Sequence, residues 1–561
     1  MLGIAGKTGR TGDRLMGRVR QRSRAFRRDE NGVLVIFGLV LFVLMAMMGG
    51  LAIDFMKFEQ TRTTLQNTLD RSTLAAASLT QTLDPETVVR DYMDKAGLSE
   101  YLTGVEVNEG INFREVIAQA TADTEPYFLH MIGIDELDAP GYSAAEQRIT
   151  NIEIVLVLDV SGSMLNNNRL TNLRSAANEF VATVLNSDAE NRISIALVPF
   201  NGQVNLGTTL RAKFTTTLNP NVANMNCVDL PAAAYDGFGV PRTLSLPMTA
   251  NSDTFTGTAG ASTSFFTPSS NTYSGPTNTG NATVNLNNRW CPPLAGNIVR
   301  LPSYNIPQLQ GYINGLTAVG ATSINAGMKW GMTLIDPAAR PMFDEFMDEN
   351  QVASYYTGRP YEFSDDDAMK IVVLMTDGEH FAEERVNDTY KTGVSPIWRS
   401  ANDGNYSIFH ASQPGTAKFW VPHLSVWQTT AWTNDATPAV PLNWTTVWTN
   451  LRMSYVAWQF YARPLGTSTA TRNTIYQTWI QAFRSQTPIG TMNTQLQSAC
   501  TQAKTSGVIV YGIAFEAPAG GATQIAGCAS SPSHYFNATG LQINTAFRAI
   551  ASNISQLRLT Q

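Results

Sequence analysis

From Ile152 to the end of the chain, continuous apolar runs of strand length alternate with segments whose apolar residues recur at helical spacing. The strand-like runs are IEIVLVLD (152–159), RISIALVPF (192–200), KIVVLMTDGE (370–379) and GVIVYGIAF (507–515). The helix-like segments are NRLTNLRSAANEFVATVLN (168–186), SINAGMKWGMTLI (323–335) and LQINTAFRAIASNISQLRL (541–559). Strands that are apolar on both faces and alternate with amphipathic helices are typical of a parallel sheet covered on both sides. We therefore predict an α/β fold over residues 151–561, with a doubly wound, mostly parallel, Rossmann-like sheet.

Two long insertions interrupt this alternation, at about residues 203–310 and 381–490. The first is rich in Gly, Ser, Thr, Asn and Pro. The second contains eight of the ten tryptophans. A Trp-rich insertion could present a surface for a ligand or partner, but most such tryptophans build a satellite core, which is our expectation here.

The N-terminal part of the chain has a different pattern. Residues Val33 to Ile53 form an uncharged, apolar run of 21 residues, which as a helix would span roughly 30 Å of hydrocarbon. We predict a single transmembrane helix at 31–55. A cleaved signal peptide would have an apolar region of about 7–15 residues before a small-residue cleavage site, and this run is longer.

The region 56–150 is predicted to be a small α+β linker. Leucines and alanines at helical spacing over 59–79 predict that the membrane helix continues past the span. A second helix is expected at 85–98, with Asp84 as its N-cap and Pro85 at its first position. For residues 101–150 we expect short strands and a helix.

Charge orients the predicted span. The first 30 residues carry nine Lys or Arg and three acids, whereas the whole chain has a net charge of -6. The positive-inside rule places this basic tail, 1–30, in the cytoplasm and the residues after Asp54 outside. The tail could alternatively bind nucleic acid, but its position beside the span favours contact with anionic lipid headgroups, and no nucleic-acid partner is predicted.

The four cysteines all fall in the part assigned to the outside, where two disulfides can form. Three pairings are possible. We favour Cys227 with Cys291 and Cys500 with Cys528, because each pair brackets one segment. No CxxC motif or His/Cys cluster predicts a zinc site.

Oxygen-bearing side chains gather where the predicted strands end. In IVLVLDVSGSM (154–164) the first strand ends in Asp159, and Ser161 and Ser163 follow at alternate positions. Thr322 precedes a helix, and Asp377 ends a strand within TDGE. Ligands of doubly wound sheets bind at the carboxyl ends of the strands, so these five side chains are expected to converge.

Two carboxylates and three hydroxyls are suited to a hard divalent cation, with Mg²⁺ favoured and Ca²⁺ or Mn²⁺ as alternatives. Five protein groups leave an octahedral ion at least one position that an acidic side chain of a partner could fill. Alternatively, Asp159 and Thr322 could each cap the helix that follows it. His380 could be a ligand or a base, but we expect a solvated loop histidine.

This arrangement resembles the von Willebrand factor type A (VWA) domain and its metal-ion-dependent adhesion site (MIDAS). The DxSxS motif of that family matches Asp159, Ser161 and Ser163, its threonine matches Thr322, and its second aspartate matches Asp377. The resemblance implies that both serines and Thr322 bind the metal directly, with the aspartates acting partly through water.

The whole layout also resembles TadG-like proteins of bacterial Flp (tight adherence) pilus assembly. The resemblance rests on the basic N-terminus, the anchor ENGVLVIFGLVLFVLMAMMGGLAIDF, the helix RTTLQNTLDRSTLAAAS, the entry LVLDVSGSM, and the end from CASSPSHYFNA to LQINTAFRAIASNISQLRLTQ. It covers both ends and the sheet but not the insertions. It implies a single-pass protein of the bacterial inner (cytoplasmic) membrane with a periplasmic C-terminal domain. The fifth residue after Gly32 is Phe37, so processing as a prepilin, which needs Glu there, is not predicted.

The leading hypothesis is a non-enzymatic, membrane-anchored assembly or adhesion factor. It would bind an acidic side chain of a protein partner, with other pilus assembly components as candidates, through the metal. A structural scaffold, whose metal only stabilises the loops, is a second hypothesis. A metal-dependent hydrolase or haloacid-dehalogenase-type phosphotransferase is a third. The latter chemistry requires a carboxylate two residues after Asp159, where Ser161 stands, and no GxxxxGK[ST] loop or nucleophile elbow is present.

Overall fold

The computed structural model describes residues 31–556 except 79–80, 82, 110–112, 149–150, 187, 189–190, 255–281, 283 and 366. The predicted basic tail, 1–30, and part of the first insertion therefore lie outside the described residues. The chain forms two compact units, residues 1–149 with 559–561 and residues 150–558.

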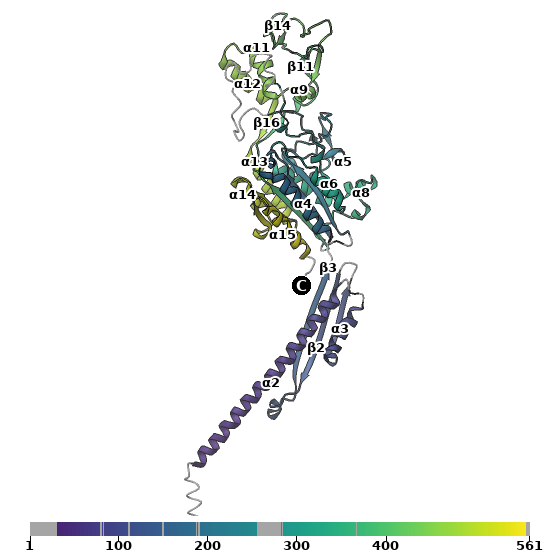
Figure 1. Cartoon of the computed structure of the whole chain (residues 1–561), viewed down its shortest axis with the longest axis vertical. Coiled ribbons are helices and arrows are strands. Elements are labelled where there is room, and N and C mark those ends of the chain that lie inside the picture. The colour runs from purple at the N-terminus through teal and green to yellow at the C-terminus, as the bar shows by residue number, and fades with distance from the viewer. Residues whose placement is uncertain are drawn as a thin grey trace, which may run out of the picture. The chain divides into compact units, whose positions relative to one another are not determined.

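The first unit is built on one long helix, α2 (Asn31–Ala77), drawn in purple in Figure 1. Its C-terminal half packs against a three-stranded antiparallel sheet of order β1-β2-β3, formed by β1 (Leu102–Glu109), β2 (Phe113–Thr124) and β3 (Leu137–Arg148). The sheet contributes mostly alanines to this core, and Leu65 and Leu69 of α2 fill the space. At Gly141 a Cβ atom would lie 2.7 Å from Leu69 Cδ1, so the helix lies too close for a side chain there.

The sequence predictions for this unit are partly correct. The helix does continue past the apolar run, and α3 (Pro85–Lys95) begins where predicted, with the Asp84 carboxylate accepting a hydrogen bond from Thr87 N. The expectation of short strands and a helix over 101–150 was wrong. Strands β2 and β3 are 12 residues each, and the described residues of that range contain the 3₁₀ turn Leu129–Ile132 but no α-helix. The N-terminal half of α2 carries exposed apolar side chains, and this helix is long and apolar enough to cross a membrane.

The second unit is organised around a six-stranded sheet of order β18-β17-β9-β4-β5-β8. Its strands are β4 (Asn151–Asp159), β5 (Ile193–Phe200), β8 (Arg300–Ser303), β9 (Ala368–Thr376), β17 (Ile509–Phe515) and β18 (Tyr535–Ala538). All pairs are parallel except β5 with β8. The predicted mixed α/β class and parallel core are thus confirmed. Strand β8 falls within the predicted first insertion but belongs to the sheet, so that boundary was wrong.

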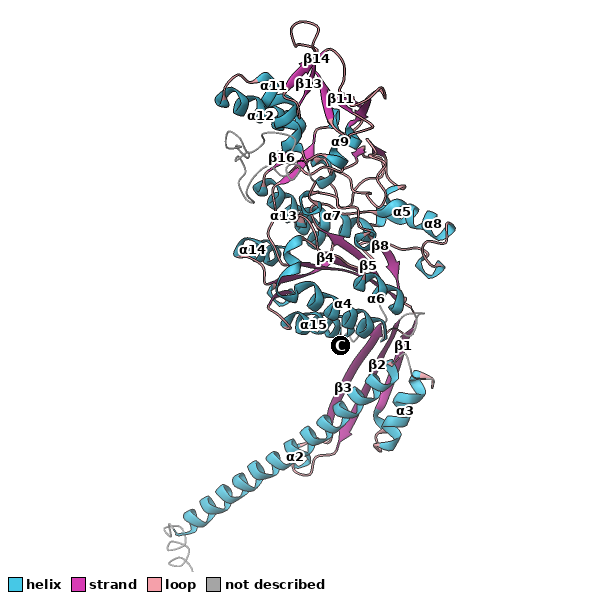
Figure 2. Cartoon of the chain, turned by 45° about the horizontal axis from the view of Figure 1, so that its top comes forward, coloured by secondary structure: helices cyan, strands magenta, loops and turns pink. Residues whose placement is uncertain are grey.

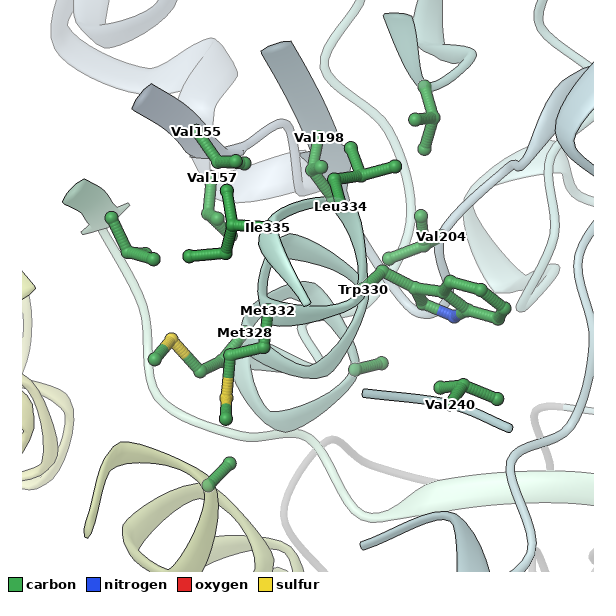
Figure 3. Close-up of a cluster of buried hydrophobic side chains, with 14 of the residues drawn as sticks. Val155, Val157, Val198, Val204, Val240, Met328, Trp330, Met332, Leu334 and Ile335 are labelled. Carbon is green, nitrogen blue, oxygen red and sulfur yellow. The ribbon is translucent and has the colours of Figure 1, made fainter. Parts of the chain in front are cut away.

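Helices pack on both faces of this sheet (Figure 2). One face carries α4 (Arg169–Asn186), α6 (Ile306–Asn314) and α15 (Gln542–Gln556), and the other carries α7 (Ile324–Ile335), α13 (Ile489–Thr505) and α14 (Ala519–Cys528). Alternate residues of β4 serve the two cores. Leu156 faces the core of α4, whereas Val155 and Val157 face α7, whose Met328, Trp330 and Met332 are drawn in Figure 3.

Helix α7 is buried along its whole length. A Cβ atom on Gly331 would lie 2.6 Å from Val157, and one on Gly327 would lie 2.6 Å from Phe200. These two glycines let the backbone of α7 approach the sheet closely. This close packing also sets how far the loop that precedes α7 lies from the sheet. The remaining helices near the sheet are the short α5 (Gly207–Arg211) and α8 (Arg340–Asp348).

The second insertion forms its own layer of structure. Its strands make a five-stranded antiparallel sheet, β14-β13-β12-β11-β15, and a two-stranded one, β10-β16. The bounds are β10 (Glu383–Val386), β11 (Val394–Arg399), β12 (Tyr406–Phe409), β13 (Phe419–Val421), β14 (Val426–Gln428), β15 (Val440–Asn443) and β16 (Arg484–Thr487), with helices α9 (Trp444–Asn450), α10 (Met453–Tyr455), α11 (Arg463–Leu465) and α12 (Thr469–Phe483).

Six of the eight tryptophans of this insertion take part in a satellite core, as expected for most of them. Trp420, Trp444, Trp448 and Trp458 are buried in one cluster, and Trp427 and Trp479 pack against it.

The first insertion adds the two-residue strands β6 (Thr216–Thr217) and β7 (Leu246–Pro247). Both favoured disulfides are present, Cys227–Cys291 and Cys500–Cys528.

Candidate functional site: a cluster of hydroxyls and carboxylates at the carboxyl end of the sheet

Backbone hydrogen bonds hold together the loops that follow β4 and precede α7. Val319 N donates to Val160 O at 2.8 Å, and Gly162 N donates to Gly320 O at 2.9 Å. Gly320 adopts a positive φ of 85°, which a residue with a side chain rarely takes. The two loops are therefore fixed to each other before any side chain is considered.

The serines of the first loop contact the aspartate that follows β9. Ser163 Oγ donates to Asp377 Oδ1 at 2.7 Å, Ser161 Oγ lies 3.4 Å from the same oxygen, and the two hydroxyls are 3.0 Å apart. Strands β4 and β9 are adjacent and parallel, so their carboxyl ends lie side by side. This pairing brings together residues that are 214 positions apart in the chain.

Asp159, the last residue of β4, is fully buried. Its Oδ1 accepts a hydrogen bond from Ser161 N at 2.7 Å, and its Oδ2 accepts one from the Thr376 hydroxyl. Burial, together with the nearby Asp377 carboxylate, raises the pKa of Asp159 to about 7. Its bond to Ser161 N closes a local turn, and Ser161, not Asp159, stands at the N-cap of the next 3₁₀ helix, so the capping alternative does not describe this residue.

Thr322 lies beside the loop that carries Asp377. Its carbonyl oxygen accepts a hydrogen bond from Phe381 N at 3.0 Å. A Cβ atom at Gly378 would lie 3.4 Å from Thr322 Oγ1 and 3.9 Å from Ser163 Oγ, so both hydroxyls face the same glycine. The N-cap position of α7 belongs to Ser323, whose side chain makes no capping bond, so Thr322 is not a cap either.

An ion pair that the sequence did not suggest crosses this cluster. Arg169, the first residue of α4, donates from Nη1 to Asp377 Oδ2 at 2.7 Å and from Nε to Glu516 Oε2 at 2.8 Å. Glu516 follows β17 and also accepts from Gly540 N, and the Arg169 bond and then the Gly540 bond keep the pKa of Glu516 below its usual value. One carboxylate oxygen of Asp377 is thus paired with a guanidinium.

The expectation for His380 was wrong. Its side chain is buried rather than solvated, because Nε2 accepts a hydrogen bond from Asn325 N in the first turn of α7, at 3.1 Å, and Nδ1 lies 2.7 Å from Asn493 Oδ1 of α13. Burial lowers the pKa of His380 to about 4. The residue is a neutral link between two helices and the loop after β9.

The donor set fits a hard cation. Asp159, Ser161, Ser163, Thr322 and Asp377 offer only oxygen atoms, and the raised pKa of Asp159 reflects two carboxylates close together at a buried position. The described residues contain no group of three or more His, Cys, Asp or Glu placed to hold a metal. Metal binding remains a prediction.

Sequence reasoning missed Thr376, Arg169 and Glu516. The signal for Glu516 was present, because GVIVYGIAF was identified as a strand and the residue after it is an acid at the same end of the sheet. Thr376 and Arg169 carry no comparable pattern. Their roles follow from which strand and helix become neighbours.

The family comparison concerns the N-terminal helix. Residues 32–79, which cover nearly all of α2, match the model of a family described as putative Flp pilus-assembly TadE/G-like. The TadG-like resemblance noted in the sequence is confirmed over this segment. No curated protein matches the chain.

Solved structures resemble the chain only distantly. The vWF domain of the type V pili tip protein Mfa5 from Porphyromonas gingivalis is 13% identical, with a TM-score of 0.28, and the match covers 74% of this chain and 97% of that one. The pilus adhesin SpaC from Lactobacillus rhamnosus GG is 12% identical with a TM-score of 0.27, and the match covers 81% of this chain and 33% of that one. The pilus adhesin RrgA from Streptococcus pneumoniae is 10% identical with a TM-score of 0.26, and the match covers 82% of this chain and 50% of that one. The chain thus spans about a third and half of the lengths of SpaC and RrgA.

Proposed function

We propose that this protein is a non-enzymatic pilus assembly or adhesion factor, held in the bacterial inner membrane by α2, with residues 56–561 outside the cytoplasm. The 21 uncharged residues and the basic segment before them support the anchor and its orientation. The match of residues 32–79 to a pilus-assembly family supports the biological setting. The second unit is a doubly wound VWA-type domain in this proposal, supported by the strand order and by helices on both faces.

The second part of the proposal is a metal-dependent adhesion site. Ser161, Ser163 and Thr322 hold a divalent cation, Mg²⁺ first and Ca²⁺ or Mn²⁺ as alternatives, while Asp159 and Asp377 supply negative charge. When bound, the cation would provide positive charge and a free coordination position for an acidic side chain of a partner protein. Asp159, held by Ser161 N and Thr376, keeps the loop after β4 in place.

One observation carries this proposal. The Ser163 hydroxyl, from the loop after β4, and the Asp377 carboxylate, from the loop after β9, meet at 2.7 Å. The fully buried Asp159 lies near enough to Asp377 for that second carboxylate to raise its pKa. Two buried acids among hydroxyls favour a cation, because burial and the Asp377 carboxylate both disfavour the ionised form of Asp159 in the absence of positive charge.

Metal binding can be measured on the full chain in detergent, with Mn²⁺ as the probe and electron paramagnetic resonance as the readout. Mn²⁺ should bind and Mg²⁺ should displace it. Ser163→Ala should weaken Mn²⁺ binding at least about tenfold, or ~1.4 kcal/mol. Asn166→Ala changes an exposed side chain of the same loop and should leave the affinity unchanged. Equal affinities for both variants would contradict the assignment.

Adhesion and a purely structural metal give different results in a second measurement. Bound Mn²⁺ that keeps an open position relaxes water protons strongly, and a glutamate-containing peptide should reduce this effect by replacing the water. The same peptide with glutamine in place of glutamate should not. Tight Mn²⁺ binding with no response to the glutamate peptide would favour the scaffold hypothesis.

A further inference from the structure

The loop between β2 and β3 is fixed to helix α2 at the end of the apolar run. The Asp54 carboxylate, which is 1% exposed, accepts hydrogen bonds from the backbone N–H groups of Tyr127, Phe128 and Leu129, each at 2.8 Å. Asp54 is the first charged residue after Val33–Ile53. A charge-assisted contact with three amides therefore joins the loop to the helix at the boundary of the predicted span.

The same loop extends one helical turn further, into the apolar run itself. Gly50 is buried, because a Cβ atom there would lie 2.3 Å from Phe128 Cγ. The neighbouring Gly49 has nothing within 4 Å of the corresponding position. Phe128 thus packs against the one face of α2 where a glycine gives it room, at the level of the last turn of the apolar run.

Three other large apolar side chains of the loop are more than half exposed. Tyr127 is 67% exposed, Met131 is 75% exposed and Ile132 is 52% exposed, within the nine-residue stretch PYFLHMIGI. Exposed apolar side chains grouped on one loop mark a contact surface more often than a solvated turn. The Lys57 ammonium lies 4.3 Å from the centre of the Tyr127 ring and donates to Glu125 O, so a cation sits directly above the apolar group.

We propose that the β2–β3 loop is a second membrane contact, with Tyr127, Met131 and Ile132 inserted in the interfacial layer of the bilayer that α2 crosses. The proposal rests on the proposed membrane anchor. The position of the loop along α2 supports this proposal. The contacts with Gly50 and Asp54 hold Phe128 beside the end of the apolar run, where the hydrocarbon core of the bilayer would meet the headgroups. An aromatic ring with a lysine above it suits that layer. The acids Asp135 and Glu136 follow the loop, which favours zwitterionic over anionic lipid.

A single spin label can report the depth of the loop, because all four native cysteines are in disulfides. The full chain would be reconstituted in phosphatidylcholine vesicles with a nitroxide at Met131→Cys, Val40→Cys or Leu83→Cys. Val40 lies in the middle of the apolar run. Leu83 is exposed and lies beyond the C-terminal end of α2. That end, Ala77, is about 40 Å along the helix from Gly50 at 1.5 Å per residue.

We expect the label at 131 to be more accessible to oxygen than to a water-soluble nickel chelate, at a depth between the labels at 40 and 83. If the label at 40 is in water, the membrane anchor itself is refuted. If the label at 40 is in lipid but that at 131 matches that at 83, only the loop contact is refuted. A label at 131 that is shielded from both reagents would mean that protein covers the loop, and it would also overturn the proposal.

A matched pair of variants tests the cause of this depth. Gly50→Ala places a methyl group against Phe128 and should move the 131 label toward the values of the label at 83. Gly49→Ala makes the same change on an open face and should leave the 131 label in place. The label at 40 should be unaffected in both, and an equal response of the 131 label to the two variants would contradict the proposed packing.

Discussion

Arg169 donates from Nη1 to Asp377 Oδ2 at 2.7 Å, so a guanidinium holds one oxygen of an aspartate that we assign to metal binding. The same side chain reaches Glu516 and is 14% exposed. The guanidinium of Arg169 and a metal ion from solution would then compete for the carboxylate of Asp377. Arg169 should tune the affinity of the site.

Arg169→Gln should tighten Mn²⁺ binding about tenfold, because it frees Asp377 Oδ2 and removes a positive charge within a few ångströms of the site. Competition between Mg²⁺ and Mn²⁺ measures this change. Arg548→Gln removes the same charge from an exposed pair with Glu179 and serves as the control. Unchanged or weaker binding in Arg169→Gln would mean that the ion pair positions Asp377 rather than competing for it.

The sequence predicts the centre of this fold well. Strands β4, β5, β9 and β17 are apolar on both faces, so the local pattern predicts that they are strands and where they lie along the chain. Strand β8 was missed because it has four residues, includes Pro302, and lies in a region rich in Gly, Pro and Asn. Helix α13 was missed because its exposed face carries Thr and Gln in place of charges, which obscures the amphipathic pattern.

The candidate site divides in a similar way. The convergence of Asp159, Ser161, Ser163 and Asp377 was predictable, because the carboxyl ends of parallel strands lie at the same edge of a sheet. Their role in metal binding stays a prediction. Arg169 and His380 were not, because their partners come from distant elements. The environment of His380 depends on Asn493 in a helix that the sequence pattern did not reveal.

The two disulfides should contribute unequal stability. Cys227–Cys291 closes 64 residues and Cys500–Cys528 closes 28. Chain entropy then predicts a loss of about 4 kcal/mol for the double serine variant of the first pair and about 0.7 kcal/mol less for the second. Urea unfolding of the two double variants measures the difference. A larger loss for the Cys500 and Cys528 variant would show that strain or packing outweighs loop length.

Glu153 and Lys370 form a buried ion pair between β4 and β9, in the strands that carry the two aspartates. Burial raises the pKa of Glu153 and lowers that of Lys370. Glu153→Met should cost about 3–5 kcal/mol, since it leaves an unpaired buried ammonium. Adding Lys370→Met should recover most of that loss, as measured by urea unfolding. A double variant no more stable than the single one would mean that Tyr361 N and Ile335 O, which bond the pair, need it as much as the charges do.

His380 should make the stability of the second unit depend on pH. Its pKa is lowered to about 4 by burial, from 6.5, so between these values the unfolded chain binds a proton that the folded chain does not. The stabilisation is therefore complete above about pH 6.5 and is lost as pH falls toward 4, by on the order of 3 kcal/mol. Protonation would in addition remove the hydrogen bond that Nε2 accepts from Asn325 N.

Asp159 titrates in the opposite sense over an overlapping range, because its raised pKa of about 7 makes the folded chain the better proton acceptor. The quantity to compare is therefore the free energy of unfolding of the wild type and of His380→Gln. The amide oxygen of the glutamine can still accept a hydrogen bond from Asn325 N, but the side chain does not titrate. Urea unfolding in chelator should give a difference that grows in favour of the variant from pH 7 to pH 4. A constant difference over that range would mean that the pKa of His380 is not shifted by folding, as for an exposed side chain, and the buried link between α7 and α13 would be wrong.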